Sequence, residues 1–263
     1  MQENPVRLDF SPEGLAVVTL DRPDRRNAID EALIERLSDI FADLAEQDGV
    51  RALMLRGEGP AFCAGADLAW MARAGERDEA DNLADAQSLA LMLRNLAELP
   101  IPTLALVQGA AIGAGAGLVA ACDLAIATAD AEFCFSEVRL GLIPATVAPY
   151  VVQAIGPRHA RRLFLTGERF SADEARRIGL VQEVLPDGAA LGHAADRLVE
   201  ALWQGAPGAQ ADAKHLVADV FAVEVDDHLL RDTARRLAAR RVSDEGREGI
   251  AAFLGRRKPD WAR

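Results

Sequence analysis

The most constraining feature of the sequence is an apolar stretch, Leu99–Cys122, whose second half consists mostly of glycine and alanine. Its length would suffice to cross a bilayer. However, it contains two prolines and several polar residues, and Asp123 follows it directly. Small side chains allow backbone segments to approach closely. The stretch therefore predicts a buried strand over 103–107 and a tightly packed helix over 113–122.

Charge and composition narrow the class of protein. The 263 residues contain 29 Lys and Arg against 41 Asp and Glu, for a formal net charge of −12, and 50% of them are hydrophobic. Such a chain is long and apolar enough for one large globular domain or two small ones. A nucleic-acid surface needs a dense face of Lys and Arg, so nucleic acid is excluded as a partner.

The cellular location is constrained by the same composition. The first ten residues include Glu3, Arg7 and Asp9, so no signal peptide is expected there. The three cysteines are odd in number and widely spaced, which does not fit a disulfide framework. We therefore expect a cytoplasmic protein with no membrane partner.

Hydrophobic periodicity predicts an α/β core followed by helices. Apolar runs typical of strands alternate with helical spacing in the first two thirds, and almost only helical spacing follows Pro144. The best-defined helix is 30–46, with Asp30 as its N-cap. Predicted strands cover 15–20, 51–55, 103–107, 124–127 and 132–135, and further helices cover 85–99, 113–122, 158–165, 172–178, 189–203, 207–220, 225–241 and 243–254. The polar stretch 73–85 is expected to be exposed.

No linker or low-complexity segment separates the two parts of the chain. We divide it into a core, residues 1–200, and a C-terminal helical region, residues 201–263. The helical region is expected to pack on a neighbouring subunit.

Several enzyme classes lack their signature residues. No serine stands in a GxSxG nucleophile elbow, and no GxxxxGK[ST] phosphate-binding loop occurs. The four histidines show no metal-ligand spacing, so no metal site is expected. The glycines at 113, 115 and 117 are out of register for the GxGxxG dinucleotide fingerprint.

Two loops combine small residues with the start of a helix. One is 61–68 (AFCAGADL), and the other is the glycine-rich run 108–118. Backbone N–H groups at a helix start can hold a developing negative charge. The two loops could therefore form an oxyanion hole around a carbonyl oxygen. The alternative is that the small residues only allow a helix to pack closely on a strand.

Glu137 is the candidate proton-transfer group. It follows an apolar strand and precedes an apolar turn. A carboxylate in such surroundings tends to have a raised pKa, which suits proton transfer near neutral pH. The alternative is a surface ion pair between Glu137 and Arg139.

Together, in this order and spacing, these elements resemble the enoyl-CoA hydratase/isomerase (crotonase) family. The resemblance covers essentially the whole chain. It begins at 22–28 (RPDRRNA), continues through the three motifs above, and ends with 165–184 (LTGERFSADEARRIGLVQEV) and 248–261 (EGIAAFLGRRKPDW). It implies an α/β spiral of ββα repeats with a C-terminal helical trimerisation region, assembled as a homotrimer or homohexamer.

The resemblance also assigns roles to particular positions. The backbone N–H groups of Ala66 and Ala114 would hold the thioester oxygen, and Glu137 would be the acid/base. Adding or removing a proton at the α-carbon puts negative charge on that oxygen as an enolate, which is why such donors are needed. Coenzyme A would be bound by the following residues: Arg25, Arg26, Ala64, Asp67, Leu68 and Gly113, with Phe253 and Arg256 of a neighbouring subunit. CoA is part of the substrate, so no separate cofactor is expected.

One position departs from the family pattern. Family hydratases usually carry a second catalytic glutamate, and that position aligns with Gly117. Two carboxylates can divide the activation of water and the α-proton between them, whereas one suffices for a double-bond shift. The stretch 136–156, with GLVAACD, nevertheless resembles bacterial methylglutaconyl-CoA and isohexenylglutaconyl-CoA hydratases of leucine and terpenoid breakdown.

Three functions follow from these patterns. The leading hypothesis is a lyase that hydrates a 2-enoyl-CoA, such as 3-methylglutaconyl-CoA. The alternatives are a Δ3,Δ2-enoyl-CoA isomerase and a non-catalytic CoA-binding protein. Acyl-chain specificity is expected to come from Trp70, Met71 and the segment 73–87.

Overall fold

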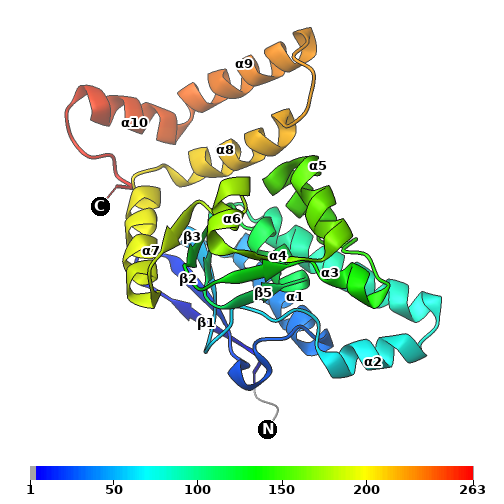
Figure 1. Ribbon diagram of the computed structural model, residues 1–263. Coiled ribbons are helices and arrows are strands. Elements are labelled where there is room, and N and C mark those ends of the chain that lie inside the picture. Colours follow the sequence, from blue (N-terminus) through cyan, green and yellow to red (C-terminus); the bar gives the residue numbers. More distant parts are fainter. Residues whose placement is uncertain (1–3, 263) are drawn as a thin grey trace.

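The computed structural model describes residues 4–262, so Glu3 lies outside the described residues. Its core is an α/β fold with two sheets (Figure 1). The larger has the order β1 (Val6–Phe10), β2 (Leu15–Leu20), β3 (Ala52–Gly57), β4 (Thr103–Val107), β6 (Leu124–Thr128) and β9 (Glu183–Leu185). The smaller has the order β5 (Ala110–Ile112), β7 (Glu132–Cys134) and β8 (Arg169–Ser171).

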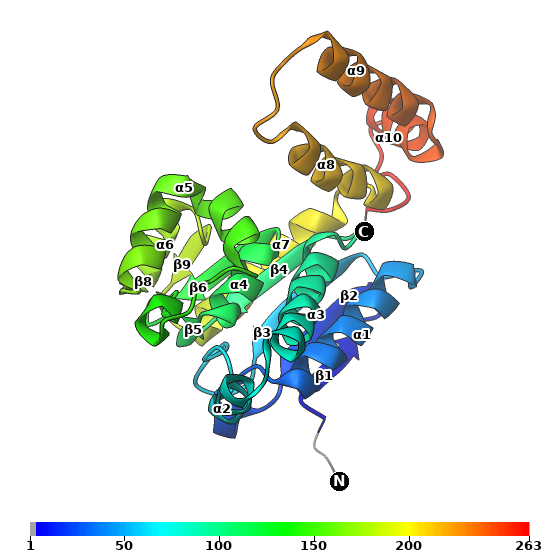
Figure 2. The ribbon, with the colours of Figure 1, turned by 90° about the vertical axis from the view of Figure 1, so that its right-hand side faces the viewer.

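The larger sheet is parallel from β2 to β9, and only β1 pairs in the antiparallel sense. Its strand β4 is buried along its whole length, as expected for a parallel sheet covered on both faces. Successive side chains of β3 face opposite layers: Leu55 packs into the cluster with α1 and α3, and Met54 packs into the cluster with α7. Figure 2 shows α1 and α3 side by side against the core.

The core helices are α1 (Glu31–Glu46), α2 (Leu68–Glu76), α3 (Glu79–Ala97), α4 (Ala114–Ala121), α5 (Ala148–Thr166), α6 (Ala172–Ile178) and α7 (Gly188–Trp203), with short 3-10 turns η1 (Pro23–Arg25) and η2 (Glu137–Leu140). The predicted N-cap of α1 is confirmed, because the Asp30 side chain accepts a hydrogen bond from the backbone N–H of Leu33 at 3.1 Å. The predicted strand over 103–107 and the helix of small residues after it are also confirmed. Within residues 4–262, no helix is long and apolar enough to cross a membrane.

The polar stretch 73–85 is mostly helical. It comprises the end of α2 and the start of α3, with Asp78 as the N-cap of α3. Arg73 and Arg77 form salt bridges to Glu31 of α1, at 2.8 and 3.6 Å, and Arg77 also pairs with Asp85 within the stretch at 2.6 Å. The stretch is thus an exposed helical layer.

Three C-terminal helices follow the core: α8 (Pro207–Val220), α9 (Asp227–Val242) and α10 (Asp244–Leu254). Helix α8 is joined to the core through Lys214, whose Nζ lies 2.8 Å from Asp123, and α9 and α10 extend away from the core (Figures 1 and 2). Along the described helices α8 and α9 no side chain is buried. Arg51 of the core connects to the C-terminal region through two hydrogen bonds. Its guanidinium donates to the carbonyl oxygens of Gly205 and Trp261 at 3.0 and 2.9 Å. The division after residue 200 stays a prediction.

Candidate active site

Asn27 shapes the loop that leads to Ala66. Its side chain is fully buried, and its Nδ2 donates to the carbonyl oxygens of Ala61 at 2.8 Å and Phe62 at 3.2 Å. Nδ2 also lies 3.0 Å from the carbonyl oxygen of Glu58, and Oδ1 accepts from the N–H of Arg22 at 2.9 Å. The backbone of Asn27 is left-handed (φ 56), which asparagine tolerates better than most residues. Sequence analysis did not single out this residue.

The next part of the loop is docked by backbone hydrogen bonds. The N–H of Ala64 donates to the Arg26 carbonyl at 2.9 Å. Ile29 donates to the Gly65 carbonyl at 2.7 Å and accepts from the N–H of Asp67 at 2.8 Å. The backbone of Ile29 thus forms hydrogen bonds with the residues before and after Ala66, but none with Ala66 itself. Within residues 4–262, no oxygen accepts a hydrogen bond from the Ala66 N–H.

The second loop runs beside the first. Cys63 donates to the Ala110 carbonyl at 2.9 Å, and its own carbonyl accepts from the N–H of Ile112 at 3.0 Å. The chain then turns at Gly113, where φ is 53 and only glycine is unstrained. Helix α4 begins at Ala114, whose N–H also has no acceptor within the described part of the chain. Two neighbouring loops thus each present a backbone N–H without an acceptor.

Glu137 begins the turn η2 and extends toward this second loop. A Cβ placed on Gly113 would lie 3.1 Å from Glu137 Oε1, so the carboxylate rests against the start of α4. Oε2 is buried and has no hydrogen-bond partner among residues 4–262. Burial raises the pKa of Glu137. No ion pair joins Glu137 to Arg139, although both residues are described, so the surface-pair alternative is wrong.

Asp67 anchors the start of α2 and carries a negative charge. Its Oδ1 accepts from the N–H groups of Ala69 at 2.9 Å and Trp70 at 3.1 Å. Burial acts to raise the pKa of Asp67, but these hydrogen bonds and the charges of Arg25 and Arg22 outweigh it and lower the pKa. The Arg25 guanidinium lies 3.5 Å from Asp67.

The remaining residues predicted to bind CoA fall into two groups. Arg25, Arg26 and Leu68 are exposed near the start of α2, beside the backbone of Ala64 and Asp67. Phe253, in α10, is 83% exposed, and Arg256 follows that helix. Both views show α10 and α2 far apart (Figures 1 and 2). Within one copy of the chain, these two residues therefore do not lie at this surface.

Position 117 has no room for a side chain. A Cβ on Gly117 would lie 2.2 Å from Cγ1 and 2.9 Å from Cβ of Val147, far closer than any real contact. Val147 is itself 1% exposed and cannot move into solvent. Of the two positions where family hydratases carry a catalytic glutamate, only position 137 therefore holds a carboxylate here.

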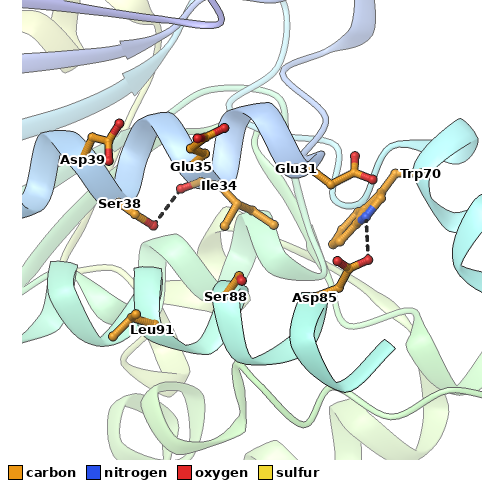
Figure 3. A pocket seen from close by; sticks show the side chains of 9 residues that line it. All are labelled: Glu31, Ile34, Glu35, Ser38, Asp39, Trp70, Asp85, Ser88 and Leu91. Atoms are coloured by element: carbon orange, nitrogen blue, oxygen red, sulfur yellow. Dashed lines mark hydrogen bonds between the residues drawn. The ribbon is translucent and has the colours of Figure 1, made fainter. Parts of the chain in front are cut away.

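A separate cavity of about 400 Å³ opens between α1, α2 and α3 (Figure 3). Trp70 lies at one end, and its Nε1 donates to Asp85 at 3.3 Å. Its lining comprises Glu31, Ile34, Glu35, Ser38, Asp39, Trp70, Asp85, Ser88 and Leu91, and Glu137 is not among these residues. Trp70 thus faces this cavity, and its predicted role in acyl-chain specificity stays a prediction.

Solved structures with the same architecture define the class of this protein. An enoyl-CoA hydratase from Shewanella pealeana superposes with a TM-score of 0.95 at 39% identity, covering 99% of this chain and 97% of that one. Pseudomonas aeruginosa AtuE gives a TM-score of 0.94 at 39% identity, covering 98% of this chain and 100% of that one. The protein is thus an enzyme with the crotonase fold.

Sequence comparison gives the family. The model for enoyl-CoA hydratase/isomerase matches residues 11–263. The enoyl-CoA isomerase/hydratase fer4 of Mycosarcoma maydis is 35% identical over 256 residues, covering 94% of this chain and 92% of the relative. The chain belongs to the enoyl-CoA hydratase/isomerase family.

Proposed function

We propose that this enzyme hydrates a 2-enoyl-CoA thioester through an enolate held by the N–H groups of Ala66 and Ala114. The observation that carries the proposal is the desolvated Glu137 carboxylate resting against the loop that presents the Ala114 N–H. Preorganised donors of this kind typically contribute about 3 kcal/mol each to the stability of the transition state.

A single carboxylate can complete this reaction. Glu137 removes a proton from water as the water oxygen bonds to the β-carbon, and the double-bond electrons move onto the thioester oxygen. The two N–H groups hold that enolate oxygen. Glu137 then returns its proton to the α-carbon. The C=C electron pair of the enolate forms the new C–H bond, and a lone pair on the enolate oxygen re-forms the thioester carbonyl. These are proton transfers and one addition, so the chemistry calls for no cofactor beyond the CoA of the substrate.

The substrate we propose carries a distal carboxylate, as 3-methylglutaconyl-CoA does, which would place the enzyme in leucine degradation or related fatty acid metabolism. Val147 leaves no room for a second protein carboxylate at position 117, so a carboxylate on the substrate would take over the positioning of water. We expect kcat/KM for 3-methylglutaconyl-CoA to exceed that for crotonyl-CoA by about tenfold or more, the worth of one charge-assisted hydrogen bond. Hydration rates measured side by side check this, and equal values contradict the proposed substrate.

The single carboxylate also supports a second candidate, a Δ3,Δ2-enoyl-CoA isomerase. In that reaction Glu137 would take a proton from the α-carbon of a β,γ-unsaturated thioester and return it to the γ-carbon. Incubation with one β,γ- and one α,β-unsaturated thioester separates the two candidates. A hydroxyacyl product supports the hydratase, and a shifted double bond without hydroxyacyl product supports the isomerase.

The proposed assembly is a homotrimer or homohexamer. The C-terminal helices expose large apolar side chains, among them Leu230 and Leu237 of α9 and Phe253 of α10. Another copy of the chain would cover them and would bring Phe253 and Arg256 to the substrate. We also propose a cytoplasmic location, in keeping with three cysteines that form no disulfide.

A further inference from the structure

The segment 137–147 approaches helix α4 closely at two points, one helical turn apart. At Gly113, a Cβ would lie 3.1 Å from Oε1 of Glu137. At Gly117, a Cβ would lie 2.2 Å from Cγ1 of Val147. The Gly117 N–H donates to the Gly113 carbonyl at 3.0 Å, so the two glycines are joined by a hydrogen bond of the first turn. The two ends of the segment, Glu137 and Val147, therefore both pack against glycines in the first turn of α4.

Hydrogen bonds close a turn at each end of this segment. The N–H of Leu142 donates to the carbonyl of Glu137 at 3.0 Å, and the N–H of Ala148 donates to the carbonyl of Pro144 at 3.0 Å. Val147 stands directly before α5, with its carbonyl accepting from the N–H of Val151 at 3.1 Å. Only residue 143 separates these two hydrogen-bonded turns, so we expect a displacement at Val147 to move Glu137.

Val147 is suited to act as a fixed spacer. It is 1% exposed, and a β-branched side chain has few χ1 rotamers available. Opposite it, α4 is buried on all sides: a Cβ on Gly115 would lie 2.5 Å from the Cys63 carbonyl oxygen. Helix α4 therefore cannot retreat from Val147 without disturbing the loop that leads to Ala66.

We propose that Val147 and Gly117 are positioning residues whose contact sets the distance between the Glu137 carboxylate and the Ala114 N–H. With glycine at 117, Val147 sits directly on the helix, and Glu137 is held against Gly113. The inference rests on the proposed function, because it concerns the geometry in which Glu137 transfers protons.

The first test is Gly117→Ala, which adds one methyl group at the contact. We expect kcat to fall about 100-fold, because misplacing a catalytic group by about 1 Å has this effect. KM for the CoA substrate should change much less than kcat, since most residues proposed to hold CoA, such as Arg25 and Leu68, lie on other elements. A merely structural defect would lower the melting temperature without this split between kcat and KM.

The second test is rescue. Val147→Ala removes two methyl groups, so the double variant Gly117→Ala/Val147→Ala should recover most of the lost kcat and melting temperature. Gly192→Ala is the matched control: this glycine lies in α7, and its added Cβ would meet nothing within 4 Å. That variant should keep wild-type kcat.

Exchange of the α-hydrogens of butyryl-CoA in deuterated water is measured alongside turnover, because it reports enolate formation whichever product follows. If the wild-type protein shows neither turnover of enoyl-CoA substrates nor exchange of the α-hydrogens, the proposed function is refuted. An active wild type with a Gly117→Ala variant of unchanged kcat would overturn the positioning role alone. If Gly117→Ala does not fold, the double variant decides: recovery of folding and of kcat supports the contact, and failure to recover either overturns it.

Discussion

Glu137→Gln is expected to reduce kcat by 10²- to 10⁴-fold, the usual contribution of a general acid/base. The substitution keeps the size of the side chain but removes the group that ionises against the start of α4. The measurement is initial-rate hydration and isomerisation of enoyl-CoA thioesters at saturating substrate.

The matched control for this variant is Glu132→Gln. Glu132 lies five residues earlier, on β7, and its side chain is 55% exposed in an ion pair with Arg169. It should keep wild-type activity. If Glu137→Gln retains full kcat, Glu137 is not the acid/base, and both proposed reactions lose their catalytic group.

Glu137→Gln should alter the pH dependence of stability in a defined direction. Because burial raises the pKa of Glu137 in the folded state, the folded protein binds this proton more tightly than the unfolded chain does. The contribution to stability is full below the unfolded pKa and is lost as pH rises through the folded pKa. Glu137→Gln removes this loss, so its melting temperature should equal or exceed that of wild type at neutral pH. The difference should close in acid, and a variant less stable at every pH contradicts the desolvation of Glu137.

Asn27→Ala is expected to lower the free energy of unfolding by about 3 kcal/mol. It leaves the carbonyl groups of Ala61 and Phe62 and the N–H of Arg22 without their side-chain partner, and each unsatisfied buried group costs about 1–3 kcal/mol. Alanine also tolerates the left-handed backbone less well than asparagine. Urea unfolding measures the change, and activity should fall with it, because this loop carries Ala66.

Two further variants show which property of Asn27 matters. Asn27→Asp keeps the shape but replaces the donor with a carboxylate oxygen facing carbonyl oxygens, so it should destabilise at least as much as alanine. Asn82→Ala is the comparison at a more open site, since the Asn82 amide donates to the Ala74 and Asp78 carbonyls near the surface. If Asn27→Ala lowers the free energy of unfolding no more than Asn82→Ala does, the burial of Asn27 has no special role.

The fold was predictable where local patterns are strong. Helix α1 shows a regular apolar face behind Asp30, and β4 is an uninterrupted apolar run, so both follow from short-range preferences. Strands β1, β5, β8 and β9 were not predicted. They are short or mixed in polarity, and they form only because a partner strand lies beside them, as β2 does for β1. The helical turns within 73–85, at the end of α2 and the start of α3, were missed for a related reason, since the distant charge of Glu31 pairs with Arg73 and Arg77 there.

The sequence predicted the motifs of the candidate site, but it did not predict the residues that hold those motifs in place. Ala66, Ala114 and Glu137 lie in segments that are recognisable along the chain. Asn27 and Val147 were missed, because each acts on a segment far away in sequence: Asn27 on 58–62 and Val147 on Gly117.

The amino-acid sequence by itself determined the family, the order of the elements and the kind of group available at each functional position. The family resemblance rests on motifs in their order and spacing, and the elements rest on local composition and periodicity, all of which can be read along the chain. Only the tertiary structure decided that the Ala66 and Ala114 N–H groups are left without acceptors, that Glu137 is desolvated against Gly113, and that Val147 fills the space at position 117. Those properties depend on which atoms remain unpaired or in contact once distant segments have packed together, and no segment holds that information alone.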